Sequence, residues 1–178
     1  LASFTLVGDR GMITGNHLPA LRAAGVEWVS ALNSQSLKKL VVDGVIQPSL
    51  FEEENLAEVV HADYPGERLI ACRNPVLGRL RAHKRQELIT ATLAELVKVQ
   101  KVVSSGKLKG KAKIGVRVGG KLGKYRVGKH IKLDITDDRL TFEVNQESVM
   151  AEAAMDGIYV IRTSLPAEAL SAADTVRA

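Results

Sequence analysis

The stretch SFTLVGDRGMI, residues Ser3 to Ile13, sets the first expectation for the fold. Its apolar, β-favouring residues predict a strand that ends near Gly8, and Asp9 follows before the turn-forming Gly11. In open α/β sheets, side chains at the carboxyl ends of strands reach a crevice in which ligands bind. A carboxylate there can bind a metal ion. The alternative is that Asp9 caps the next turn or pairs with Arg10.

The residues after Gly11 predict a helix and a second strand. Asn16 suits the N-cap, Pro19 suits the first turn, and Gly25 suits the end of the helix. The segment VEWVSAL, residues 26–32, then has the composition of a buried strand. Strand, helix and strand together form a right-handed parallel unit.

The middle of the chain predicts a short helix over 36–44, a connecting segment, a strand over 68–73 and a long helix over about 76–104. Cations crowd the first turns of the long helix, where they face the positive end of the helix dipole. These cations either bind DNA phosphate or form a basic face in contact with solvent. The cations named as candidate DNA contacts are Arg79, Arg81, Lys84 and Arg85.

The composition changes after Gly106. Ten cations and no acid occur between Lys107 and Lys132, whereas the whole chain has a net charge of +5. A local positive patch of this kind is typical of a nucleic-acid interface. Four of the cations alternate, so an extended backbone would aim them to one side. The ten are Lys107, Lys109, Lys111, Lys113, Arg117, Lys121, Lys124, Arg126, Lys129 and Lys132.

The same segment favours antiparallel strands. Alternation of apolar and polar residues through IGVRV, KYRVGKHIKLDIT and RLTFEV predicts a basic β-meander over about 112–145. A short helix over 146–155, a strand over 157–164 and a closing helix near Pro166 complete the chain. This order predicts a β-containing module inserted into an α/β core.

Composition bounds the class of protein. With 178 residues, 46% of them hydrophobic, the chain can bury a core as one domain, or as one domain with an insertion. No apolar run approaches the ~20 residues of a membrane span, and no signal-peptide pattern is present, which predicts a soluble protein. The single cysteine, Cys72, suits a reducing cytosol and, lying in the apolar run LIAC, a buried position. The first residue is Leu1, so we expect the chain to be part of a longer protein.

Three segments resemble DDE-type insertion-sequence transposases, in the group with a long insertion before the final glutamate. They are FTLVGDRGMIT, DYPGERLIACRNP and DGIYVIRTSLP, and they occur in the same order as in that group. The resemblance implies an α/β fold with a partial ribonuclease H-like core, interrupted by an α+β insertion. It implies core residues 1–36, an insertion over 37–145 and a return to the core over 146–178.

The resemblance also implies a chemistry. Three carboxylates of such transposases hold two Mg²⁺ ions ~3.5–4 Å apart for cutting and joining phosphodiesters, and hard Mg²⁺ prefers oxygen ligands. Asp9 matches the second aspartate, as catalytic residue and metal ligand. The first aspartate would precede Leu1 and the glutamate would follow Ala178, so this fragment alone should not cleave DNA.

The implied partners are duplex DNA at the ends of the element, through the cations named above, and further copies in a homo-oligomeric full-length protein. The implied location is the cytoplasm of a bacterial or archaeal cell, at the nucleoid, with no membrane partner. Two alternatives remain open. One is a non-catalytic remnant that binds DNA or interferes with intact transposase, and the other is an unrelated soluble α/β protein whose lysines keep it in solution.

Overall fold

The computed structural model describes residues 4–177, which fold as two compact units. Unit 1 comprises residues 4–78 and 157–177, and unit 2 comprises Arg79–Asp156. Unit 1 contains a five-stranded mixed sheet with helices, so the prediction of an α/β protein is confirmed. Within residues 4–177, no helix is both long enough and apolar enough to cross a bilayer.

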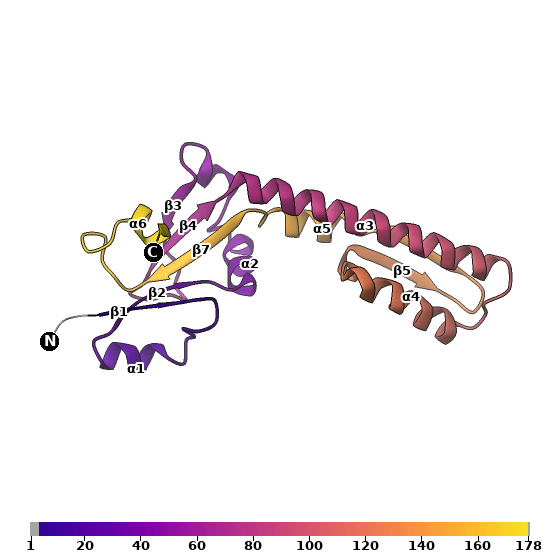
Figure 1. Cartoon of the computed structure of the whole chain (residues 1–178), viewed down its shortest axis with the longest axis horizontal. Coiled ribbons are helices and arrows are strands. Elements are labelled where there is room, and N and C mark those ends of the chain that lie inside the picture. The colour runs from indigo at the N-terminus through magenta and orange to yellow at the C-terminus, as the bar shows by residue number, and fades with distance from the viewer. Residues whose placement is uncertain (1–3, 178) are drawn as a thin grey trace. The chain divides into compact units, whose positions relative to one another are not determined.

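The sheet of unit 1 has the strand order β1-β2-β7-β4-β3 (Figure 1). Its first pair, β1 and β2, is parallel, and every other pair is antiparallel. The predicted strand, helix and strand at the start of the chain are therefore confirmed. The strands are β1 (Thr5–Gly8), β2 (Glu27–Ala31), β3 (Leu56–Val59), β4 (Arg68–Arg73) and β7 (Ile158–Thr163).

The described residues of unit 1 include four whole helical segments, α1 (Leu18–Ala23), α2 (Ser34–Val42), η1 (Pro48–Phe51) and α6 (Ala172–Arg177), and the first residues of a longer helix. The N-cap of α1 is His17 and not Asn16 as predicted, and no side chain caps it. Asn33 does cap α2, because its side-chain oxygen accepts hydrogen bonds from the backbone N–H groups of Gln35 and Ser36. The closing helix begins at Ala172, later than Pro166.

The expectation of a simple connecting segment in unit 1 was wrong. The connection over 45–67 contains the strand β3, a four-residue edge strand whose pairing with β4 a local pattern does not reveal. The strand before Asp9 is largely exposed, because β1 is the other edge of the sheet, and Val7 is 56% exposed. The buried residues of the sheet lie in the inner strands β2, β4 and β7, where Leu69 is fully enclosed.

Unit 2 packs helices against a two-stranded hairpin. It contains α3 (Pro75–Ser104) from Arg79 onward, α4 (Lys111–Tyr125), η2 (Gly128–His130), β5 (Ile131–Ile135), β6 (Leu140–Val144) and α5 (Gln146–Ala153). Figure 1 shows α4 and β5 alongside α3. The core joins Leu96 and Val103 of α3 to Ile114 and Val118 of α4, and includes Leu140 of the hairpin. The long helix was predicted almost to the residue.

The predicted β-meander over 112–145 was wrong. Only β5 and β6 are strands there, and residues 111–125 form α4. Ile114, Val118 and Leu122 recur every fourth residue and pack on the core of unit 2, which is a helical period. This packing outweighs the poor helix propensity of the glycines of α4. The short alternation in IGVRV therefore indicated the wrong period.

The boundaries of the units also differ from the expected ones. Residues 37–78 belong to unit 1, because β4 pairs with β7 along six residues and β3 pairs with β4. Residues 146–156, with α5, belong to unit 2. The change in composition marks the start of the basic segment near Gly106. The boundary of unit 1 is set instead by the pairing of β4 with β7, whose residues are about 90 positions apart.

Candidate nucleic-acid interface and the position of Asp9

The three segments that carry the resemblance meet in the sheet of unit 1. β4 and β7 pair from Arg68 opposite Thr163 to Arg73 opposite Ile158. Beyond the last pair, the backbone N–H of Asn74 donates to the carbonyl of Gly157 over 2.8 Å. β1 lies two strands from β7, on the far side of β2.

A buried ion pair links two of these segments. Arg162 donates from Nε and Nη2 to the two carboxylate oxygens of Glu67, over 2.6 and 2.5 Å. Trp28 also donates its Nε1–H to Glu67 over 3.4 Å, and the Arg162 guanidinium lies 5.1 Å from the centre of the Tyr64 ring. Glu67 is thus fully occupied inside the protein and is not offered as a metal ligand. The sequence alone did not indicate that Arg162 is the partner of Glu67.

Asp9 is exposed and lies directly after β1. Its Oδ1 accepts a hydrogen bond from the backbone N–H of Arg10 over 2.6 Å, and its carbonyl accepts one from Ser30 Oγ over 3.4 Å. Within residues 4–177, no three His, Cys, Asp or Glu side chains gather as a metal cluster. One carboxylate does not fit two Mg²⁺ ions, so we derive no cleavage step from this chain.

Charge separates strongly between the units. Unit 2 holds 17 Lys or Arg against nine Asp or Glu, a net charge of +8, and the rest of the chain is −3, which gives the total of +5. Unit 2 is therefore where a polyanion would be attracted. The basic segment that the sequence showed between Lys107 and Lys132 lies entirely within unit 2.

The arrangement of the cations differs from the expected one. Lys107 and Lys109 lie in the turn before α4, while Lys111 and Lys113 lie in its first turn. Because the backbone is not extended, the alternating lysines do not form a comb along one side. That prediction was wrong for the same reason as the β-meander.

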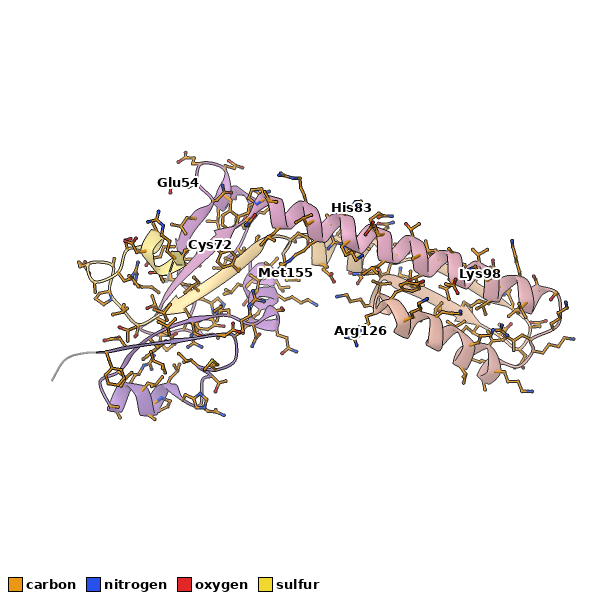
Figure 2. All side chains as sticks on the ribbon, in the orientation of Figure 1. Glu54, Cys72, His83, Lys98, Arg126 and Met155 are labelled. Carbon is orange, nitrogen blue, oxygen red and sulfur yellow. The ribbon has the colours of Figure 1, made fainter. Side chains whose placement is uncertain are left out.

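Helix α4 carries five cations and no acid. Four of them, Lys111, Lys113, Arg117 and Lys124, are exposed, and none of these four side chains has an acidic partner within 4 Å among the described residues. Lys124 Nζ lies 5.1 Å from the centre of the Tyr125 ring. The left-handed Arg126, at φ +56°, ends the helix (Figure 2).

Other predicted DNA contacts are bound to acids. Lys121 and Lys98 hold Glu95 between them, over 2.7 and 2.5 Å, and their hydrogen bonds lower the pKa of Glu95 to about 2. Lys129 pairs with Glu152, and Lys132 lies 3.6 Å from Glu143. These cations must leave a carboxylate before they can bind phosphate.

Arg85 does not have the exposed side chain that the predicted DNA contact requires. Its side chain is 8% exposed and donates to both oxygens of Asp156 over 3.0 and 2.5 Å. These hydrogen bonds raise the pKa of Arg85. The Arg85–Asp156 pair ties α3 to the end of unit 2, so Asp156 is a partner rather than only a turn residue. Arg79, Arg81 and Lys84 are exposed on the first turns of α3, with Lys84 3.4 Å from Glu87.

His130 lies inside unit 2. Its Nδ1 is 3.0 Å from Ser148 Oγ, and its Nε2 is 3.2 Å from a carboxylate oxygen of Glu152. Burial lowers the pKa of His130, despite the neighbouring Glu152. The sequence showed no partner for this histidine, because Ser148 and Glu152 belong to a helix that follows the hairpin.

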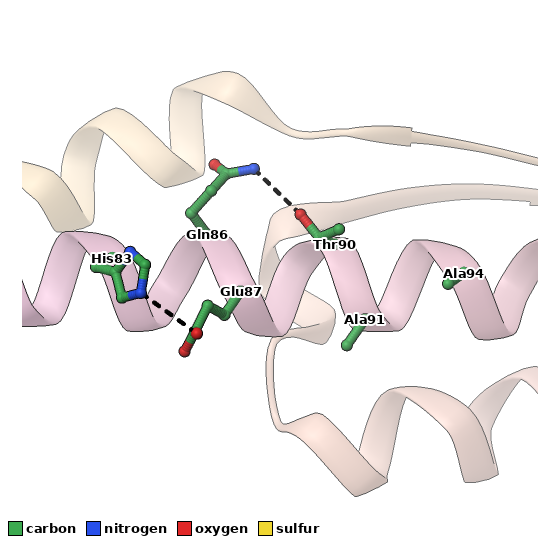
Figure 3. Close-up of a pocket in the computed structure, with 6 residues that line it drawn as sticks. All are labelled: His83, Gln86, Glu87, Thr90, Ala91 and Ala94. Carbon is green, nitrogen blue, oxygen red and sulfur yellow. Dashed lines mark hydrogen bonds and ion pairs between the residues drawn. The ribbon is translucent and has the colours of Figure 1, made fainter.

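Two remaining features do not form a candidate site. A shallow pocket of about 430 Å³ lies along α3, lined by six of its residues (Figure 3). Its polar groups already pair, His83 with Glu87 over 3.3 Å and Gln86 with Thr90 over 3.4 Å. Cys72 on β4 (Figure 2) is buried, as predicted, and burial raises the pKa of its thiol to about 11. Such a thiol is a poor nucleophile at neutral pH.

Comparisons of the chain with protein-family models, with curated proteins and with solved structures give no match.

Proposed function

We propose that the chain is the DNA-binding portion of a DDE-type DNA transposase with a ribonuclease H-like core. In this proposal unit 2 contacts the phosphates of duplex DNA, and Asp9 supplies one metal ligand in the complete protein. The observation that carries the DNA-binding part is the acid-free helix α4 with four exposed cations whose side chains lack acidic partners among the described residues.

Electrostatics supports this choice of surface. Lys and Arg that neutralise phosphates release counterions from DNA, and this term supplies most sequence-independent affinity. A charge of +8 on unit 2 beside −3 on the rest of the chain directs a polyanion to unit 2. Contacts to phosphates fix the orientation of a protein on the duplex without reading its sequence.

The transposase part of the proposal rests on the three resembling segments and on the place of Asp9. A mixed sheet with an aspartate just beyond the carboxyl end of a parallel strand is what the resemblance implies. Asp9 is exposed, so it is accessible to a metal ion held with carboxylates from elsewhere in a longer protein.

A second candidate is a DNA-binding protein that does not cut DNA. The hydrogen bond that Asp9 Oδ1 accepts from the backbone N–H of Arg10 favours it, because this bond gives the carboxylate a local role. In both candidates unit 2 binds DNA, and they differ in whether Asp9 acts in phosphodiester chemistry.

DNA binding is tested by titrating two duplexes of unrelated sequence with the chain, at several salt concentrations between about 50 and 200 mM. We expect similar affinities for both duplexes and a linear fall of the logarithm of the binding constant with the logarithm of salt concentration. A chain that binds neither duplex at the lowest salt contradicts the proposal.

The role of Asp9 needs a separate experiment. The chain is extended with flanking coding sequence that supplies an upstream aspartate and a downstream glutamate, and strand transfer is measured with Mg²⁺. Asp9→Asn should abolish strand transfer and leave the affinity for DNA unchanged. Strand transfer that persists in Asp9→Asn would remove Asp9 from the metal site and favour the second candidate.

A further inference from the structure

We infer that unit 2 binds the phosphate backbone along one stripe of α4, formed by Lys113, Arg117 and Lys124, and not through its cations in general. This inference rests on the proposed DNA binding and names the surface that performs it. The other predicted contacts of unit 2 then contribute long-range attraction only.

The geometry of the helix places the three cations together. They are four and seven residues apart, and positions at these spacings share one face of a helix. At about 100° per residue they fall within an arc of about 40°, and the rise of 1.5 Å per residue spreads them over roughly 16 Å. The other side of α4 is fixed by burial, because Ile114 and Val118 lie in the core of unit 2.

The stability of the helix does not explain all of these positions. A cation near the C-terminal end of a helix is favoured by the dipole, whereas one in the first turn is disfavoured. Lys113 lies in the first turn of α4, where the carboxylate of Asp137 instead accepts from the backbone N–H of Lys111 over 2.8 Å. Asp137 therefore pairs with the backbone at the start of α4 and not with the side chains of the stripe.

One flank of the surface between Arg117 and Lys124 carries no side chain. Gly120 is three residues from Arg117 and four from Lys124, and a Cβ added there would have no atom within 4 Å. On the other flank of the stripe, Lys121 lies four residues after Arg117 and three before Lys124, and its Nζ is held by Glu95 over 2.7 Å. A phosphate chain can therefore lie against the Gly120 flank of the stripe without displacing a side chain there.

The stripe is tested by replacing Lys113, Arg117 and Lys124 together with Gln. The matched control replaces three other exposed cations of unit 2, Lys98, Lys101 and Lys132, with Gln, so that the net charge changes equally. The stripe variant should lose about 2.7 from the salt slope of duplex binding, at ~0.9 per phosphate contact, and the control should lose less than about 1. Far-ultraviolet circular dichroism and a melting curve establish that each variant is folded.

A second pair of variants changes one residue. Gly120→Glu places a carboxylate between Arg117 and Lys124, whereas Gly119→Glu adds the same charge on the same helix about 100° away from Gly120. Both glycines are exposed and have open space for a side chain. Gly120→Glu should weaken duplex binding on the order of tenfold relative to Gly119→Glu.

The possible results separate the two proposals. Equal losses in the stripe and control variants, with a wild-type chain that binds DNA, overturn the stripe and leave DNA binding by unit 2 intact. A wild-type chain that does not bind DNA overturns the proposed function, and the stripe with it. Selective loss in the stripe triple and in Gly120→Glu supports the inference.

Discussion

Arg162 on β7 and Glu67 before β4 form a two-fold hydrogen-bonded ion pair inside unit 1, although they are 95 residues apart in the chain. The Glu67 side chain is 1% exposed and that of Arg162 is 9% exposed. The pair therefore closes the end of the β4–β7 ladder with charges that water does not screen.

Removal of Glu67 should strongly destabilise the chain. Glu67→Ala leaves the Arg162 guanidinium buried without its carboxylate, which costs about 3–5 kcal/mol. The matched control is Glu58→Ala, because Glu58 also takes two hydrogen bonds from an arginine, Arg68, but is 42% exposed. The control should cost no more than about 1 kcal/mol. Urea unfolding of both variants measures the difference, and equal costs would contradict burial as its cause.

Gly157 should not tolerate a side chain. It has φ +76°, and a Cβ there would lie 2.3 Å from the carbonyl oxygen of Asn74 and 2.9 Å from the backbone N of Gly78. Gly25 has a similar φ of +66° but open space around it. Gly25→Ala should cost about 1–2 kcal/mol through backbone strain alone, and Gly157→Ala should cost at least ~1–3 kcal/mol more. Similar melting temperatures for the two variants would show that Asn74 and Gly78 leave room for a side chain at Gly157.

The stability of unit 2 should depend on pH through His130. Because burial lowers the pKa of His130 below its ordinary 6.5, the unfolded chain takes up that proton first as pH falls. The free energy of unfolding should therefore decrease below pH 6.5. The nearby Glu152 has its own pKa lowered, against burial, by Lys129, so its contribution is lost only below its ordinary 4.5.

The variant His130→Gln isolates this effect. Its unfolding free energy, measured by urea at pH 7 and pH 5, should fall less than that of the wild type. His83→Gln removes a histidine that is 74% exposed and should keep the wild-type dependence. A dependence that is unchanged in His130→Gln would place its source elsewhere.

The helical state of residues 111–125 makes a prediction of its own. Gly119→Ala and Gly123→Ala should each stabilise unit 2 by about 0.5–1 kcal/mol, because alanine is a better helix former and its Cβ meets nothing within 4 Å. Gly110→Ala should destabilise it, because Gly110 has φ +92°. Melting curves decide between these signs, and destabilisation by both helix variants would favour the strand interpretation.

Local patterns in the sequence were sufficient for most elements. The apolar period of α3, the turn residues around β4 and the alternation in β6 predicted those elements close to their observed bounds, whereas the strand expected over residues 124–136 is reduced to β5. They failed for α4, where four glycines and the Val-rich IGVRV favoured strands, and where packing against α3 and the hairpin decides the structure. A local pattern describes propensity, and tertiary packing overrides it.

The candidate site was harder to predict than the fold. The sequence located the cations in one segment but could not say which of them acids would occupy. Glu95 reaches Lys121 across 26 positions, and Asp156 reaches Arg85 across 71. The exposure of β1 depends likewise on its place at the edge of the sheet, which no residue of Thr5–Gly8 reveals.

The most direct test of DNA binding by α4 is a two-dimensional amide spectrum of the ¹⁵N-labelled chain, recorded while a short duplex is added at low salt. The glycines of α4 give signals in a well-separated region, so they report on this helix with little overlap. We predict that the largest shifts fall on residues 113–126, with Gly119, Gly120 and Gly123 among them. Shifts confined to the first turns of α3, or spread evenly over both units, would contradict the account.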